Sequence, residues 1–367
     1  MESLIIYGGS FDPIHNGHLR IARAASMMLN ADVVFVPSKT PRWKNPEATA
    51  AQRLEMLRLA LKQDGSPAFS IDLFEMNSRS DTNYSIDLVR HFALTHRNTR
   101  LYLMIGADEV NAFPKWKDPD KICELATPLY VSRPDVEIDD KVLATYPMQR
   151  LPYDGSGPVS SSAVRALQSV DIPLVVRDYI ESNNLYYIKR LSEMMTPHRL
   201  LHSMSVANLA YLIAQRNRVE NYPAAYIAGL LHDCGKDLDV PTAQKIMQER
   251  YNEYLFMPVW TYHQFTGEFL AETLFGIKDP SILDAIRYHS TGKAHMSPLA
   301  KIIYAVDKIE PTRGFDSKKL IQACYKHYYV GFMNVLEANK EYLASKGYII
   351  DNPLTKECFE QYLGRID

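Results

Sequence analysis

Two histidines, His15 and His18, lie near the start of the chain in a context that suits phosphate chemistry. They belong to the stretch Gly-Gly-Ser-Phe-Asp-Pro-Ile-His-Asn-Gly-His, which begins at Gly8 directly after the apolar residues 4–7. The apolar run predicts a buried strand, and the apolar spacing after His18 predicts a helix. Glycines let a backbone turn sharply and a ligand approach closely, and a helix N-terminus offers free N–H groups to phosphate. Two imidazoles at this point could donate hydrogen bonds to phosphate oxygens as negative charge develops.

Glycines and histidines can also occur in a strand–helix connection that binds no ligand. The elements predicted around this stretch therefore help to decide between the two interpretations. Up to about residue 188, short apolar runs alternate with helical patterns. We expect strands at 4–7, 32–36, 69–74, 101–105 and 129–132, and helices near 18–29, 50–62, 84–96 and 107–125. This alternation predicts an α/β domain over residues 1–188, with a doubly wound, Rossmann-like parallel sheet. Such sheets bind ligands at the carboxyl ends of their strands, beside a topological switch point.

From residue 189 to 367 the strand signal disappears and helical periodicity takes over. We expect helices at 197–216, 222–234, 242–255, 265–275, 281–289, 297–308 and 317–336. The second half is therefore predicted to be an all-α domain.

The bulk composition of the 367 residues favours neither a nucleic-acid nor a membrane partner. Lys and Arg total 41 against 43 Asp and Glu, which gives no argument for attraction to nucleic acid or a membrane. No apolar run approaches the ~20 residues of a membrane span, and the early strand is unlike a signal peptide. The four cysteines are scattered without a Cys-x-x-Cys pair, as in a reduced cytoplasmic protein. We expect a cytoplasmic protein that binds small molecules, and its composition is compatible with a homo-oligomer.

Later segments of the first half carry groups that could bind other parts of a phosphate-containing ligand. Lys44 closes a basic loop after the second strand and could meet a triphosphate, although a solvated loop looks the same. Asp108 follows the fourth strand, and the Trp116 indole could stack on a flat base or lie in the core. Ser160, Ser161 and Ser162 open a helix that contains Arg165, an arrangement that serves either phosphate binding or a helix cap.

These motifs resemble those of a known superfamily. The stretch from Gly8 is similar to the G-x-F-D-x-x-H-x-G-H signature of nucleotidyltransferases, and residues 160–165 are similar to their S-S-[ST]-x-[IV]-R motif. Residues 3–187 as a whole resemble bacterial nicotinate-mononucleotide adenylyltransferases. The resemblance implies in-line attack of the mononucleotide phosphate on the α-phosphorus of ATP, releasing pyrophosphate, with Mg²⁺ held mainly by the substrate phosphates.

The resemblance also implies roles for individual residues. His15, His18, Lys44 and Arg165 would act on the ATP phosphates. ATP would also contact Gly8, Gly9, Ser10, Phe11, Gly106, Asp108, Ser161 and Ser162, and the mononucleotide would contact Tyr84, Trp116 and Arg133.

Two segments depart from the family pattern at the substrate. Pro-Arg-Trp-Lys at 41–44 replaces Pro-Pro-His-Lys, and Asp-Thr-Asn-Tyr at 81–84 replaces Gly-Pro-Ser-Tyr. Nicotinamide mononucleotide, the amide form, is therefore the alternative acceptor.

The second half holds histidines and aspartates that suit a metal site. His232 and Asp233 are adjacent at a predicted helix end. His202, His263, His289 and Asp307 lie on other predicted helices or at their ends. Asp307 lies in an apolar stretch, where a carboxylate is costly to bury unless it is paired or bound to a metal. One such histidine alone is more often structural, but the whole set indicates a metal site, and its ligands suit iron, manganese or zinc better than calcium.

This set resembles the H…HD…H…H…D pattern of HD-domain phosphohydrolases over residues 196–313. Residues 286–292 and 307–313 resemble the bacterial branch that splits diadenosine tetraphosphate symmetrically. The resemblance implies a core metal set of His202, His232, Asp233 and Asp307, completed by a second site at His263 and His289. It also implies catalytic roles for Asp233 and Lys236 and substrate contacts at Arg287, Thr291 and Arg313.

Together these motifs predict a bifunctional enzyme. It would make deamido-NAD from ATP and nicotinate mononucleotide and, with a metal, hydrolyse diadenosine tetraphosphate, a dinucleoside polyphosphate, to ADP. Two alternatives stay open for the second half, namely hydrolysis of another nucleotide or a regulatory nucleotide-binding module without turnover.

Overall fold

The computed structural model describes residues 2–41, 45–78, 84–132, 136–153, 159–348, 350 and 352–364. The chain forms two compact units. The first contains Met1–Arg165 and Asp171–Tyr186, and the second contains Ala166–Val170 and Tyr187–Asp367. Among the described helices, none has both the length and the apolarity needed to cross a membrane.

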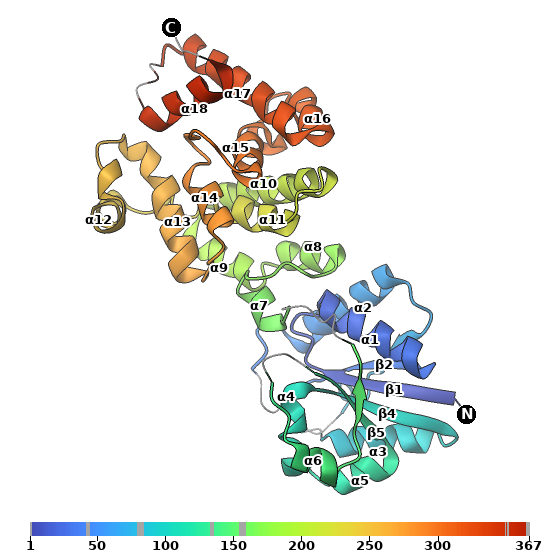
Figure 1. Ribbon diagram of the computed structural model, residues 1–367. Helices are drawn as coiled ribbons and strands as arrows, with labels where there is room; N and C mark the ends of the chain where they lie inside the picture. Colours follow the sequence, from blue (N-terminus) through green and yellow to red (C-terminus); the bar gives the residue numbers. More distant parts are fainter. Residues whose placement is uncertain are drawn as a thin grey trace. The chain divides into compact units, whose positions relative to one another are not determined.

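A six-stranded parallel sheet forms the centre of the first unit (Figure 1), in the order β3-β2-β1-β4-β5-β6. The strands are β1 (Glu2–Gly9), β2 (Asp32–Pro37), β3 (Phe69–Ile71), β4 (Thr99–Gly106), β5 (Thr127–Val131) and β6 (Gln149–Leu151). The chain runs outward from β1 to β3 and then returns to the other side of β1 with β4. This reversal creates a switch point between β1 and β4. The predicted Rossmann-like α/β fold is confirmed.

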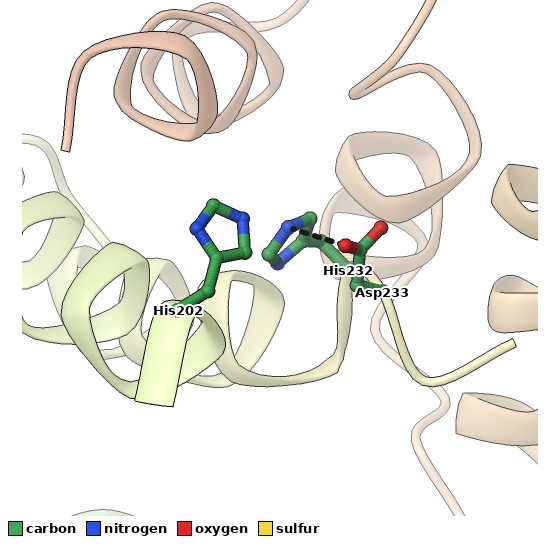
Figure 2. Close-up of side chains that lie close together, drawn as sticks. All are labelled: His202, His232 and Asp233. Carbon is green, nitrogen blue, oxygen red and sulfur yellow. Dashed lines mark ion pairs between the residues drawn. The ribbon is translucent and has the colours of Figure 1, made fainter. Parts of the chain in front are cut away.

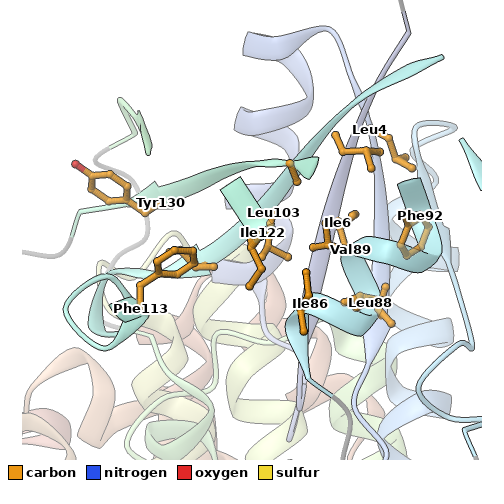
Figure 3. Close-up of a cluster of buried hydrophobic side chains, with 14 of the residues drawn as sticks. Leu4, Ile6, Ile86, Leu88, Val89, Phe92, Leu103, Phe113, Ile122 and Tyr130 are labelled. Atoms are coloured by element: carbon orange, nitrogen blue, oxygen red, sulfur yellow. The ribbon is translucent and has the colours of Figure 1, made fainter. Parts of the chain in front are cut away.

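Helices cover both faces of this sheet. Figure 1 shows α1 (Asn16–Leu29) and α2 (Ala50–Asp64) on one face and α3 (Ser85–Thr95) on the other. Ile6 of β1 and Leu103 of β4 pack with Val89 and Phe92 of α3 in one buried cluster (Figure 3). Ile5, the neighbour of Ile6, points to the opposite face and is also fully buried. Burial on both faces explains why β1 reads as a continuous apolar run.

Two expectations for the first unit are wrong in detail. The strand predicted at 69–74 ends at Ile71. The helix predicted at 107–125 consists of α4 (Ala107–Val110), the 3₁₀ turn η1 (Phe113–Lys115) and α5 (Pro119–Leu125). Pro114 and Pro119 cannot donate a helical hydrogen bond, and Asp118 adopts a left-handed φ of 53°. The short elements β6 and α6 (Asp140–Thr145) carried no recognisable pattern. The unit ends with α7 (Ser161–Arg165) and α8 (Leu174–Ser182).

The described part of the second unit contains helices and no strand, as predicted for an all-α domain. Its helices are α9 (Tyr187–Met194), α10 (Pro197–Arg216), α11 (Tyr222–Leu231), α12 (Val240–Arg250), α13 (Tyr262–Leu274), α14 (Pro280–Arg287), α15 (Pro298–Ile309), α16 (Lys318–Lys326), α17 (Tyr328–Ser345) and α18 (Pro353–Leu363), with 3₁₀ turns η2 (Asn252–Tyr254), η3 (Val259–Thr261) and η4 (Pro311–Arg313). The single helix predicted at 317–336 is wrong, because His327 is extended between α16 and α17.

Local sequence explains where several of these helices begin. Thr196, Asp279, Ser297 and Asn352 each cap a helix through a side-chain oxygen, and a proline follows each of them. The cap satisfies an unpaired N–H group of the first turn. Proline fits the first helical position because its missing donor is not needed there.

Gly17 offers a test of the packing at the start of α1. A Cβ at this position would lie 2.7 Å from Cγ1 of Val159 and 2.9 Å from Nδ1 of His15. We expect Gly17→Ala to lower the free energy of unfolding of the first unit by ~1–3 kcal/mol through overpacking, as measured by urea denaturation. Gly106→Ala is the matched control, since its Cβ would meet no atom within 4 Å. Equal stability of the two variants would contradict this account.

Candidate active sites

The glycines of the first site lie in the strand, and the turn comes after them. Gly8 and Gly9 pair with Val36 and Pro37 as the last residues of β1. The left-handed turn falls on Phe11, with φ 47°. The expectation that the glycines themselves form the turn is therefore wrong. Gly9 is needed for a different reason, because a Cβ there would lie 3.0 Å from the Phe11 ring.

His15 and His18 are brought together at the N-terminus of α1. His15 is the N-cap residue, and its backbone N–H donates to Nδ1 of His18 over 3.3 Å. The two imidazoles stack with their centroids 3.6 Å apart. Asp171 holds this helix start, since its carboxylate accepts from Asn16 and from Arg20, each over 2.8 Å. The histidine pair is thus fixed where a phosphate would meet the helix N-terminus.

A buried carboxylate, Asp12, organises the loop between β1 and α1. It accepts hydrogen bonds from the N–H groups of Glu47 and Ala48 and from the hydroxyl of Tyr186, the last over 2.8 Å. Burial and the adjacent Asp12 raise the pKa of Tyr186, so this hydroxyl remains a donor. Arg165 donates to the Asp12 carbonyl over 2.6 Å and to the Glu47 carboxylate over 2.8 Å. Arg165, which is predicted to bind phosphate, therefore lies against the loop between β1 and α1.

The serines of α7 meet the same loop. Ser161 donates through Oγ to the Pro13 carbonyl over 2.9 Å. Ser160 accepts from the Ala163 N–H as a helix cap, and Ser162 accepts from Nη2 of Arg165. Ser161 thus contacts the loop directly, and Ser162 is linked to it through Arg165.

Arg53 is a fully buried residue of this region that sequence reasoning missed. Its guanidinium donates to the carbonyls of Ser10, Lys39 and Ala48. It therefore ties the loops after β1 and β2 to α2. Nothing in its position within a helical pattern distinguishes it from a solvent-exposed arginine.

The remaining predicted residues of the first site follow β4 or precede α3. Gly106 and Asp108 are exposed at the carboxyl end of β4, which pairs with β1. Tyr84 and Trp116 are half-buried and pack against the same apolar cluster. Trp116 lies 5.1 Å from the Phe113 ring, so it is partly a core residue. Lys44 and Arg133 lie outside the described residues, as do residues 42–43 and 81–83.

Four buried histidines of the second unit are oriented by their Nδ1 atoms. In His232, His263 and His289, Nδ1 lies 2.7 Å from the backbone carbonyl three residues earlier. A carbonyl only accepts, so Nδ1 carries the proton and Nε2 presents a lone pair. In His202, Nδ1 lies 2.8 Å from the Glu310 carboxylate. Each Nε2 atom is thereby turned toward the carboxylates at the centre.

The Nε2 atoms converge on Asp233 and Asp307. Asp233 belongs to two groups of ligand atoms, each within 4.8 Å, one with His202 and His232 and the other with His263 and His289. Figure 2 shows the first group, with His232 between His202 and Asp233. Oδ1 of Asp307 lies 3.2 Å from Nε2 of His202 and 3.6 Å from Nε2 of His232.

This arrangement fits a bound cation. The Nε2 atoms of His263 and His289 are 3.1 Å apart, although neither carries the proton that a hydrogen bond between them would need. Nε2 of His232 is buried and accepts no hydrogen bond within the described chain. Burial lowers the pKa of His263 to about 3, which keeps it in the neutral form that binds metals.

Neighbouring groups stabilise the charged forms of several side chains in the cluster. Burial opposes ionisation of Asp233 and Asp307, but neighbouring histidines and cations hold the pKa of both carboxyls well below the usual range. Burial also lowers the pKa of His202, but its hydrogen bonds to Asp307 and Glu310 outweigh this and raise the pKa to about 9. The proton on His202 is the positive charge that a metal ion would replace.

Three partly exposed cations surround the cluster. Nζ of Lys236 lies 3.2 Å from both Asp233 oxygens, and Arg199 donates to Asp233 over 3.3 Å. Arg313 donates to Asp307 over 2.6 Å. Arg199 was not predicted, although it lies one helical turn before His202. These cations could meet phosphate oxygens.

The other two predicted substrate residues are engaged within the protein. Arg287 forms a two-point ion pair with Glu268, which links α14 to α13, the helix that carries His263. Thr291 is buried and donates to Gln264. Lys308 was missed, yet it is half-buried and donates to the His289 carbonyl over 3.1 Å. These contacts position the helices that carry the ligands.

Comparison with known proteins matches each half of the chain to a family. The Cytidylyltransferase-like family matches residues 6–167, and the HD domain family matches residues 199–312. A probable nicotinate-nucleotide adenylyltransferase/Ap4A hydrolase of Mycoplasma genitalium is 31% identical, over 85% of this chain and 88% of that protein. A protein of the same description from Mycoplasma pneumoniae is 29% identical, over 84% and 89%.

This chain belongs to the nicotinate-nucleotide adenylyltransferase/Ap4A hydrolase family. The predicted resemblance to a fusion of these two activities is confirmed. The nicotinate-nucleotide adenylyltransferase of Bacillus subtilis is 31% identical over 51% of this chain and 99% of its own length. Nearly the whole of that relative therefore aligns with about half of this chain.

The two groups of ligand atoms predict separable metal sites. We expect two Mn²⁺ ions per chain after equilibrium dialysis, one fewer for His202→Ala or His263→Ala, and none for Asp233→Ala because both groups share this carboxylate. The exposed His198 is the matched control, and His198→Ala should keep both ions. Full occupancy in Asp233→Ala would contradict this assignment.

Glu310 should tune the first of these sites without binding metal. Glu310→Ala removes the acceptor of the His202 Nδ1 proton, and we expect Mn²⁺ affinity to fall by ~10–100-fold. Glu310→Gln retains an acceptor oxygen and should recover part of this affinity. Unchanged binding in Glu310→Ala, measured by calorimetry, would show that the contact is dispensable.

Proposed function

We propose that this chain is a bifunctional enzyme with one nucleotide site in each unit. The first would transfer an adenylyl group from ATP to nicotinate mononucleotide, giving deamido-NAD and pyrophosphate. The second would hydrolyse diadenosine tetraphosphate to ADP. The main support is that one chain combines a histidine pair at a switch-point helix with a convergent cluster of histidines and aspartates, in a family whose members carry both names.

In the first unit, catalysis would consist of positioning and charge stabilisation, since adenylyl transfer needs no covalent enzyme intermediate. His15 and His18 would donate to the ATP phosphates at the N-terminus of α1. Arg165 lies against the same loop and would neutralise charge that develops on the leaving pyrophosphate. Lys44 would act from the loop after β2. Mg²⁺ would arrive with the ATP phosphates.

In the second unit, iron, manganese or zinc ions would be held by His202, His232, Asp233 and Asp307, and by Asp233, His263 and His289. Such ions supply Lewis acidity and an activated water at neutral pH. Lys236, Arg199 and Arg313 would bind the phosphate chain from the rim. The symmetric cut would leave one ADP on each side of the cleaved bond.

The two activities should be lost separately. Asp233→Ala should abolish hydrolysis of diadenosine tetraphosphate and leave synthesis of deamido-NAD unchanged, because it alters only the metal ligands. His18→Ala should do the reverse and lower kcat/KM of adenylyl transfer by ~10²–10³-fold. Purified protein with Mn²⁺ or Fe²⁺ would be assayed for ADP and for deamido-NAD. Loss of both activities in Asp233→Ala would contradict separate sites.

The acceptor in the first unit is tested by direct competition. With nicotinate and nicotinamide mononucleotides at equal concentration, we expect deamido-NAD to be the main product. Predominant formation of NAD would instead assign the amide as acceptor.

A further inference from the structure

Three large apolar side chains remain exposed just before His263. Phe256, Val259 and Trp260 are 69%, 47% and 65% exposed. Single exposed apolar residues are common, but a group of them beside a candidate active site is typical of a binding surface.

Hydrogen bonds and packing hold the loop that presents these side chains. The Tyr262 hydroxyl donates to the Leu255 carbonyl over 2.8 Å, and the Thr261 hydroxyl donates to the Pro258 carbonyl over 2.7 Å. Met257 is buried in the same loop, within a cluster that includes Tyr262. The exposure of its neighbours therefore belongs to a fixed backbone.

The position of Trp260 connects this patch to the metal-ligand cluster. Its carbonyl accepts the Nδ1 proton of His263 over 2.7 Å. The turn η3 runs directly into α13, and residues three apart on such a continuous path lie on the same side. His263 faces Asp233 and His289 through Nε2, so Trp260 adjoins a residue of the cluster through its backbone.

We propose that Trp260, flanked by Phe256 and Val259, is the platform on which a purine base stacks while its phosphates lie over the metal-ligand cluster. This inference rests on the proposed hydrolysis of a dinucleoside polyphosphate and names its base subsite. Lys236 and Arg313 at the cluster suit a polyanion, and the aromatic patch suits the flat apolar group joined to it. Stacking on an aromatic face is tolerant of base identity.

Steady-state kinetics of the full chain with Mn²⁺ would test the platform. We expect Trp260→Ala to raise KM for diadenosine tetraphosphate about 5- to 100-fold, as for loss of one stacked base, with a smaller change in kcat. Trp260→Tyr keeps a ring and should stay within a few-fold of wild type. Inhibition by inorganic tripolyphosphate, which has no base, should not change. Tyr342→Ala removes a 56% exposed ring on α17 and should leave KM unchanged.

Two results would overturn the platform. One is an unchanged KM in Trp260→Ala. If the sedimentation coefficient of this variant changes while its KM does not, the patch would be assigned to a protein contact. The other is an equal loss of tripolyphosphate inhibition, which would mean that Trp260 acts by supporting the cluster. If wild-type protein does not cleave diadenosine tetraphosphate, the proposed function fails. Calorimetry with ADP would then test the platform: weaker ADP binding by Trp260→Ala would support it, and unchanged binding would contradict it.

Discussion

The hydrogen bonds that fix Nδ1 of the buried histidines determine what the second unit can do. Because His232, His263 and His289 each donate Nδ1–H to a carbonyl of their own helix or turn, their lone pairs point to a common centre. Local backbone geometry alone supplies this orientation, since each acceptor lies three residues earlier. The packing of the helical unit then brings the helix ends that bear these histidines together around Asp233. Such outer contacts fix the tautomer and ring plane of ligating histidines.

In the first unit, the two histidines are positioned by a helix N-terminus and by buried side chains that bind the surrounding loops. Its two histidines lie at one helix N-terminus, and Asp12 and Arg53 secure the loops around them through backbone groups. A site for adenylyl transfer needs fixed donors more than reactive groups, because electrostatic preorganisation contributes most of the rate enhancement. The switch point of the sheet provides that fixed frame.

Sequence was sufficient for both folds and for the contiguous motifs, because these depend on local spacing. The His-Asp pair and the Gly8–His18 stretch are each coded by neighbouring residues. Arg53, Glu310 and Lys308 were missed because their roles arise from tertiary contacts that no local pattern reveals. The helix predicted at 107–125 failed for the opposite reason, since its apolar spacing continued across Pro114 and Pro119, where backbone chemistry ends a helix. The motif-based assignment of Arg287 and Thr291 to substrate stays a prediction, and the structure adds their bonds to Glu268 and Gln264.

The central claim is that the second unit is assembled to hold metal ions through Nε2 atoms on both sides of Asp233. Anomalous diffraction at the manganese edge from crystals of the full chain would test it most directly. The account predicts two peaks, each bonded to Nε2 atoms of its own histidine group and both next to the Asp233 carboxylate. No peak within the cluster, or coordination through Nδ1 of these histidines, would contradict it.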